Sequence, residues 1–190
     1  MINTKEIILK TSQKLFARFG LRKTTVDEIA KLARIGKGTI YHYFKTKEQI
    51  FAEIIDKESR YLREKIREAI QQARTPQEKL HAFVLTRLRT LKELANYYSA
   101  LKDDYLQHYS FIEKARQESF QEELKMVRSI LEEGTASKVF AVEDTGLTAF
   151  AIVTALKGLE YPWTIETSLA DIEQSVNVLI NMLFKGIETR

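Results

Sequence analysis

Residues 24–44, with the sequence TTVDEIAKLARIGKGTIYHYF, have the pattern of two short helices joined by a tight turn. Thr25 is followed three positions later by Glu28, which is the spacing of a capping box at a helix start. Apolar residues at spacings of three and four then give this helix one buried face, and it is predicted to end near Ala33. Gly36 is expected to take the turn, because glycine has no Cβ to clash there.

The second helix of this segment is predicted over residues 37–43, and it buries Ile40 together with Phe44. The side chains that carry hydrogen-bond donors are expected to point away from this buried side. They are Lys37, Thr39, Tyr41, His42 and Tyr43. Two helices with a glycine turn, the second rich in exposed donors, form the helix-turn-helix pattern. The second helix of such a motif can enter the major groove of DNA.

The charge distribution favours the same function. Residues 1–47 contain eleven Lys and Arg against three Asp and Glu, a net charge of +8, whereas the whole chain carries +4. Residues 48–190 therefore carry −4. A basic N-terminal segment suits contact with DNA phosphates, and the acidic remainder does not.

Composition limits the alternatives. The chain of 190 residues has no cysteine, which excludes disulfides, thiol catalysis and cysteine-bound zinc. No signal-peptide pattern opens the sequence, and no apolar run is long enough to span a membrane, so we expect a soluble, cytoplasmic protein without membrane contact. Only two prolines and seven glycines occur, and strand-like alternation is missing, so an all-α chain is expected.

About nine helices are predicted from caps, breakers and apolar spacing, over roughly 3–20, 25–33, 37–43, 46–73, 75–94, 97–107, 111–133, 144–160 and 168–186. The predicted N-caps are Asn3, Thr25, Thr46, Thr75 with Glu78 closing a capping box, Asp144 and Ser168. Gly20 and Gly134 are expected to stop two of them, and Pro162 a third. We expect a helix-turn-helix DNA-binding domain over residues 1–47 and a helical ligand-binding and dimerisation domain over 48–190.

The last two predicted helices are apolar on almost every side. Such a helix must be buried on every side, and a second copy of the chain is the economical way to cover it. The residues expected in this homodimer interface are Val153, Leu156, Val176, Ile180, Leu183 and Ile187. The alternative is a helix central to the core of one chain.

The segments TVDEIA (25–30) and GKGTIYHYFKTKE (36–48), with Phe19-Gly20 before them, resemble the TetR/AcrR family of bacterial transcriptional regulators. The resemblance covers about the first fifty residues. It implies a DNA-binding head, a connecting fourth helix and a body whose last two helices dimerise. It also implies a cytoplasmic, nucleoid-associated homodimer that acts as a repressor and is released from a palindromic operator by a small effector.

By position in the family pattern, the residues expected to face the groove are Lys37, Gly38, Thr39, Tyr41 and His42. Thr25, Tyr43 and Lys47 are expected to hold phosphates. Gly38 would let the backbone approach a base edge, and Lys37 can donate to guanine acceptors. Core packing inside the N-terminal domain is the alternative for Tyr41 and Tyr43.

The C-terminal domain is rich in aromatic residues that can line a pocket for a lipophilic or aromatic effector. The residues expected there are Tyr97, Tyr98, Tyr105, Tyr109, Phe120, Phe150, Tyr161 and Trp163. Filling the core is the alternative for each. An elongated apolar compound with a carboxylate or thioester end is expected ahead of a cation, although Asp103, Asp104 and Glu160 can serve a cation.

Two other functions stay open on the sequence. A helical-bundle metal enzyme is favoured by one Glu-x-x-His spacing, Glu78 to His81, but the second copy that a di-metal site needs is missing. A ligand-independent architectural DNA-binding protein is disfavoured by the many aromatic residues of the C-terminal domain, which can line a ligand pocket. We therefore expect no enzymatic activity, no cofactor and no metal.

Overall fold

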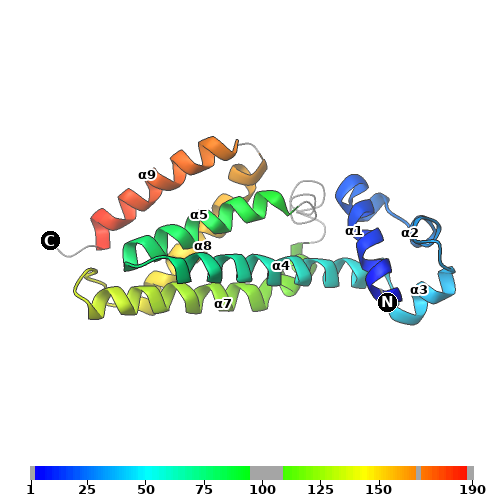
Figure 1. Ribbon diagram of the computed structural model, residues 1–190, viewed down its shortest axis with the longest axis horizontal. Helices are drawn as coiled ribbons and strands as arrows, with labels where there is room; N and C mark the ends of the chain where they lie inside the picture. Colours follow the sequence, from blue (N-terminus) through cyan, green and yellow to red (C-terminus); the bar gives the residue numbers. More distant parts are fainter. Residues whose placement is uncertain (1–2, 95–108, 166–167, 188–190) are drawn as a thin grey trace. The chain divides into compact units, whose positions relative to one another are not determined.

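The computed structural model describes residues 3–94, 109–165 and 168–187, and within them the chain is all-α, as predicted. Eight helices form there, and Figure 1 labels them. They are α1 (Thr4–Lys23), α2 (Val26–Ala33), α3 (Lys37–Tyr43), α4 (Lys47–Gln72), α5 (Pro76–Glu93), α7 (Tyr109–Ala136), α8 (Thr145–Ile165) and α9 (Leu169–Ile187). The helix predicted over 97–107 lies outside the described residues. No described helix is both long and apolar enough to cross a membrane.

The chain divides into two compact units. The head unit is Met1–Ser59 with Leu94–Arg116, and the body unit is Arg60–Glu93 with Gln117–Arg190, as far as these are described. The head unit therefore takes in the first half of α4, beyond the domain boundary that we predicted at residue 47.

The first half of α4 belongs to the head unit because it completes that unit's core. Phe51 meets Phe16 of α1 edge to face, with ring centroids 5.3 Å apart. Side chains on both helices are buried, among them Ile8, Phe16, Ile50, Phe51, Ile54 and Ile55. Two ion pairs of 2.6 Å join the same helices at the surface, Lys5 to Glu53 and Lys57 to Glu6.

Gly20 breaks α1 without ending it. Its φ of 78° and ψ of 163° are non-helical, and a positive φ of this kind favours glycine. One further turn continues to Lys23, past the end that we predicted. The Thr24 hydroxyl donates to the Gly20 carbonyl at 2.8 Å and so satisfies a carbonyl that the break leaves without a helical partner.

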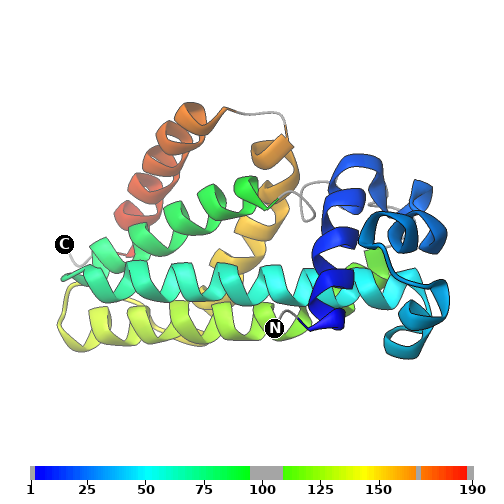
Figure 2. The ribbon, with the colours of Figure 1, turned by 45° about the vertical axis from the view of Figure 1, so that its right-hand side comes forward.

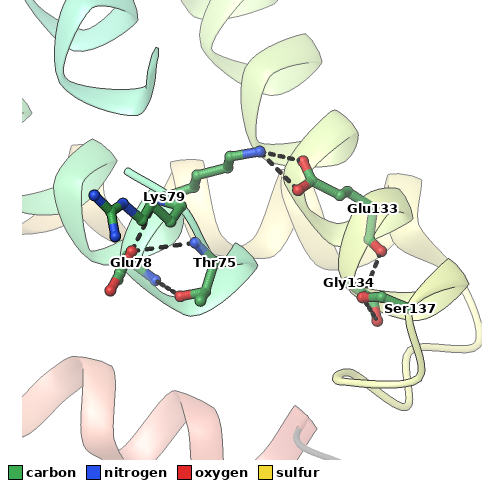
Figure 3. Close-up of polar contacts among 7 residues, drawn as sticks. Thr75, Glu78, Lys79, Glu133, Gly134 and Ser137 are labelled. Atoms are coloured by element: carbon green, nitrogen blue, oxygen red, sulfur yellow. Dashed lines mark hydrogen bonds and ion pairs between the residues drawn. The ribbon is translucent and has the colours of Figure 1, made fainter. Parts of the chain in front are cut away.

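In the body unit, α5 begins with the predicted capping box. The Thr75 hydroxyl accepts a hydrogen bond from the Glu78 amide at 3.1 Å, and the Glu78 carboxylate accepts one from the Thr75 amide at 3.1 Å (Figure 3). The two backbone amides of Arg74 and Thr75 lower the pKa of Glu78. Next to the box, Lys79 reaches across to Glu133 of α7 at 2.6 Å, and this pair ties the two helices together.

The end of α7 differs from the prediction, because the helix runs through Gly134 to Ala136. Gly134 is needed there for close packing: a Cβ on it would lie 2.1 Å from the Phe140 ring. Phe140 is buried and stacks on Phe184 of α9 at 6.1 Å between centroids. The loop after α7 is thereby folded back onto the body unit.

Helices α8 and α9 both begin at predicted caps. The Asp144 carboxylate accepts from the Leu147 amide at 2.8 Å, and the Ser168 hydroxyl accepts from the Asp171 amide at 3.2 Å. α8 continues through Pro162 to Ile165, so the predicted stop at Pro162 was wrong. A proline near a helix end removes only one hydrogen bond, and the last turn survives this loss.

Helix α5 is the centre against which α8 and α9 both pack. Polar bonds fix α9 on it at two levels: His81 Nε2 bonds with Asn177 Oδ1 at 2.8 Å, and Arg89 pairs with Glu173 at 2.5 Å. Figures 1 and 2 show α7 running alongside the second half of α4 on the other side of the body unit, where Arg63 meets Glu118 at 3.3 Å.

Candidate nucleic-acid interface and effector site

The start of α2 forms a complete capping box. The Thr25 hydroxyl accepts from the Glu28 amide at 3.2 Å, and Glu28 Oε2 accepts from the Thr25 amide at 2.7 Å. The Thr25 amide lowers the pKa of Glu28 most, and the Thr25 hydroxyl, which donates to Glu28 Oε2 at 2.9 Å, lowers it further. The side chain of Thr25, predicted to hold a phosphate, is therefore already engaged in starting the helix, whereas its position at an exposed helix N-terminus suits an anion.

The turn between α2 and α3 takes its left-handed residue at Arg34, which has φ 56° and ψ 43°. The Arg34 amide donates to carbonyls at the end of α2. Gly36, which we expected to take the turn, instead has an extended φ of −68° and sits at the N-cap of α3. An arginine in the left-handed region is uncommon, and the helix-end hydrogen bonds hold it there.

Helix α3 presents its donors to solvent, as predicted. Ile40 and Phe44 are buried in the head unit and fix the helix by its inner side. The residues that are exposed are Lys37, Gly38, Thr39, Tyr41, His42 and Tyr43. Tyr41 and Tyr43 do not fill the core, since they are 47% and 39% exposed. A Cβ at Gly38 would meet nothing within 4 Å, so the backbone there is open to an approaching groove.

Lys37, at the first turn of α3, has a partner that the sequence pattern did not reveal. Its ammonium lies 2.9 Å from both carboxylate oxygens of Asp27 on α2. Asp27 raises the pKa of Lys37, mainly through this hydrogen bond. The pair joins the two helices of the motif and holds the candidate base-reading lysine in place. Ten residues separate the partners, too many for a local spacing rule to connect them.

Lys47, the predicted phosphate contact on α4, lies against the protein's own backbone. Its ammonium donates to the carbonyls of Leu21 at 2.8 Å, Arg22 at 3.1 Å and Thr24 at 3.0 Å. An ammonium has three N–H donors, and all three are directed at these oxygens. A phosphate contact by Lys47 would have to compete with them.

The predicted effector residues fall mostly where no side chain is described. Tyr97, Tyr98 and Tyr105 lie outside the described residues. Tyr109 lies in α7, and Tyr161 and Trp163 lie in α8, without described side chains. Phe120 and Phe150 remain: their rings meet edge to face at 6.3 Å, Phe120 half-buried and Phe150 exposed. Their placement as ligand contacts stays a prediction.

A buried ionic cluster in the body unit is the feature that the sequence did not reveal as a group. Arg87 of α5 is 1% exposed; its Nε donates to Glu123 of α7 at 2.7 Å, and its Nη2 donates to Glu160 of α8. The two carboxylates are buried as well. Buried ion pairs add little stability over an apolar core, but removing one partner would leave an uncompensated buried charge. Its members are spread over 74 positions and leave no local motif.

The residues predicted for the dimer interface divide into two sets. Val153, Leu156, Val176 and Ile180 are buried in the core of the single chain, so they have no surface to offer a second copy. Only Leu183 and Ile187 of the prediction are partly exposed. The exposed large apolar side chains on these helices are Leu147, Phe150, Val178 and Met182. The last two helices are rich in apolar residues, as predicted, but most of these residues are buried in the core of the single chain.

His81, the residue behind the metal-enzyme alternative, bonds with Asn177. Within the described part of the chain, no group of three His, Cys, Asp or Glu residues gathers as metal ligands.

Comparison with known proteins decides the family. Residues 8–54, from α1 through the start of α4, match the model for bacterial regulatory proteins of the tetR family. The HTH-type transcriptional regulator YhgD of Bacillus subtilis is 28% identical over 186 residues, which cover 98% of this chain and 97% of that protein. The chain belongs to the TetR/AcrR family. It is accordingly a DNA-binding transcriptional regulator with its helix-turn-helix in the head unit.

Two solved structures share the fold of this TetR/AcrR regulator along most of its length. A transcriptional regulator from Cytophaga hutchinsonii has a TM-score of 0.76 and 28% identity, covering 97% of this chain and 98% of that one. The regulator FadR from Bacillus subtilis, solved in complex with stearoyl-CoA, has a TM-score of 0.75 and 24% identity, covering 92% and 96%. The similarity therefore extends beyond the motif to the helical body.

Proposed function

We propose that this regulator is a cytoplasmic homodimeric repressor that binds an inverted-repeat operator through α3 of each protomer and leaves it when an apolar effector enters the body unit. One observation carries the DNA half of this proposal. Helix α3 exposes five side chains that carry donors while Ile40 and Phe44 anchor it, and residues 1–47 carry a net charge of +8. The chain acts by binding alone, without catalysis.

The exposed side chains of α3 divide by chemistry. Lys37 can donate to the O6 and N7 acceptors of guanine, and Thr39 and Tyr41 can meet a thymine methyl. Gly38 lets the backbone come close, and His42 can donate to a base edge. To Tyr43, on the last turn of the helix, and to the exposed N-terminus of α2 at Thr25 we assign contacts with phosphates, which fix register rather than sequence.

The dimer is supported by an exposed stripe on α8. Exposed residues recur there at spacings of three and four, and almost all are apolar or small: Leu147, Phe150, Ala151, Thr154, Ala155 and Gly158. Val178 and Met182 of α9 are 56% and 66% exposed. Apolar surface of this kind, with small residues that permit close approach of helices, suits an isologous contact with a second copy. We call these eight residues the α8–α9 stripe.

For the effector we propose a long-chain acyl thioester or a related elongated apolar compound. FadR, which shares the fold, was solved with stearoyl-CoA. In this chain, the half-buried ring of Phe120 offers apolar surface for such a compound. A ligand changes DNA affinity only to the extent that it binds the two states of the dimer differently.

The test has two stages. Purified protein is first used to select duplexes from a random DNA library, and the expected product is an inverted repeat. Fluorescence anisotropy with that duplex then measures release by acyl-CoA thioesters of increasing chain length, with free CoA as the control. Selection without a repeat would contradict the dimeric DNA contact. Unchanged operator affinity across the acyl series would contradict the effector class and leave the DNA contact standing.

A further inference from the structure

Lys47 makes three long-range hydrogen bonds within the head unit. Its ammonium, at the first residue of α4, lies within 2.8 to 3.1 Å of three backbone carbonyls, those of Leu21, Arg22 and Thr24. These carbonyls belong to the last turn of α1 and the residue that leads into α2. The side chain is partly buried, unlike its neighbour Lys45, which is exposed.

The chemistry of this position explains the choice of lysine. The last carbonyls of a helix have no intrahelical partners and form the negative end of the helix dipole. The break at Gly20 increases the need for hydrogen-bond donors to these carbonyls, because the turn after Gly20 is separated from the rest of α1. A compact ammonium with three rotatable donors suits three oxygens that converge on one point, whereas a guanidinium directs its five donors outward within one plane.

We propose that Lys47 is a positioning residue: it clamps the start of α4 onto the end of α1 and thereby fixes the direction in which α2 and α3 leave that junction. The chain passes from the clamped carbonyls into α2 within two residues, because Thr24 directly precedes the N-cap Thr25. A loosened clamp therefore changes how α3 is presented. This inference rests on the proposed reading of DNA by α3.

The clamp and a phosphate contact require different properties of the cationic side chain. A phosphate accepts any nearby cation and favours the bidentate fork of arginine. The three-carbonyl site requires the shape of an ammonium. Around the clamp, Arg22, Lys23 and Lys45 are exposed. Their charges can contact DNA while Lys47 stays bonded to the three backbone carbonyls.

Two substitutions at Lys47 and one at Lys45 separate these roles. Lys47→Arg and Lys47→Met are both expected to weaken binding to the selected operator by about tenfold or more, since neither restores three charge-assisted bonds. The slope of log affinity against log salt should stay that of the wild type. Lys45→Met should instead lower the slope by about 1.8, because each lost phosphate contact is worth about 0.9 and a homodimer loses two. Full affinity in Lys47→Arg, with a reduced slope in Lys47→Met, would overturn the clamp.

Half-site spacing gives a readout that a merely stabilising residue would not move. With duplexes whose half-sites are moved apart by single base pairs, the wild type should show one sharp optimum, and both Lys47 variants a broader one. Circular dichroism must show the variants folded at the assay temperature. An unchanged optimum in folded variants would contradict the proposal.

A third measurement is independent of DNA, so that failure of the proposed function is distinguishable from failure of the clamp. Lysine side-chain ammonium signals persist in nitrogen-15 NMR only where exchange with water is slowed. The Lys47 signal is expected in the wild type and should be lost in Lys47→Arg, whereas a signal from Lys79, which bonds both carboxylate oxygens of Glu133, should remain. If the Lys47 ammonium of the wild type is not protected, the clamp does not exist in solution, whatever the DNA experiments show.

Discussion

At the residue scale, the function depends on which acceptors the cationic side chains bind, and Lys37 is the clearest case. Lys37 lies 2.9 Å from Asp27, and both groups are largely exposed. An exposed pair of this kind is weak, so a base edge can replace the carboxylate. Asp27 also repels phosphates, and a lysine held by it is less free to bind DNA of any sequence. We therefore expect Asp27 to contribute to specificity more than to affinity.

Replacing Asp27 with Asn tests this role. The variant should bind scrambled DNA more tightly than the wild type does, and the ratio of operator affinity to scrambled affinity should fall several-fold, because Lys37 loses the partner that restrains it. Anisotropy titrations with both duplexes measure the ratio. Glu6→Gln is the matched control, since it removes the same charge from the head unit at α1, where Glu6 pairs with Lys57. An equal fall of this ratio in Glu6→Gln would show that the loss of one negative charge, rather than the contact with Lys37, causes the effect.

Sequence reasoning at this scale succeeded where partners are local. The box between Thr25 and Glu28 follows a spacing rule and was predicted with its partners. The partners of Lys37 and Lys47 lie 10 and 23 to 26 positions away; the first contact forms only when α2 and α3 pack together, and the second only when α4 packs against the end of α1. Arg34 took the left-handed position expected of Gly36, because the end of α2, rather than residue type, decides where the turn falls.

At the element scale, the helices are started by side chains and ended by packing. Each predicted cap at Asn3, Thr25, Thr75, Asp144 and Ser168 makes a hydrogen bond to an amide at its helix start. The predicted ends were less accurate: α1 passes Gly20, α7 passes Gly134 and α8 passes Pro162. A cap is local chemistry, whereas an end depends on what the last turn contacts, and that information is tertiary.

The capping carboxylates give the stability of this protein a pH dependence. The folded state lowers the pKa of Glu28 and Glu78 below the usual 4.5, through the backbone amides that they accept. Their stabilisation is present above the unfolded pKa and is lost as the pH falls through the folded pKa. The double variant Glu28→Gln, Glu78→Gln keeps the boxes but cannot titrate. Its denaturation midpoint should fall less than the wild type's between pH 6 and pH 3; parallel curves would contradict the role of the two carboxylates.

Gly134 tests the packing at the end of α7. Alanine would normally favour a helix, but a Cβ placed 2.1 Å from the Phe140 ring forces the ring away from Phe184. Overpacking of this kind costs about 1–3 kcal/mol of unfolding free energy, more than the roughly 0.5–1 kcal/mol that alanine gains. Gly134→Ala should therefore lower the urea midpoint. Gly186→Ala is the control, because its Cβ meets nothing within 4 Å. Equal midpoints in the two variants would show that the Phe140 ring moves without cost.

At the scale of the whole molecule, residues 1–47, with a net charge of +8, carry the DNA-reading motif, and residues 48–190, with −4, carry the helices for which we propose dimerisation and effector binding. The sequence predicted the all-α class, the motif and the excess of apolar side chains in α8 and α9. It could not say which side of those helices the chain covers itself. Val153 and Ile180 turned inward, while Leu147 and Met182 stayed exposed, because α5 packs against one side of each helix.

Charges on the α8–α9 stripe should separate the protomers without unfolding them. Leu147 and Met182 are each 66% exposed in the single chain, so Leu147→Glu and Met182→Glu bury no charge until a second copy arrives. Glutamate at position 147, in the first turn of α8, also suits the helix dipole. Sedimentation should show monomers at micromolar concentration, with the exposed Gln121→Glu on α7 as a dimeric control. Two folded, dimeric stripe variants would place the interface elsewhere.

The central claim is that α3 reads base sequence while the basic head unit neutralises phosphates. The most direct measurement is the dissociation constant of the wild type for the selected duplex and for a scrambled duplex of equal length, across salt concentrations from 50 to 200 mM. The predicted result is a preference of about 10³-fold or more for the selected duplex, with both affinities falling as salt rises. Equal affinity for the two duplexes, or affinities that do not change with salt, would contradict the account.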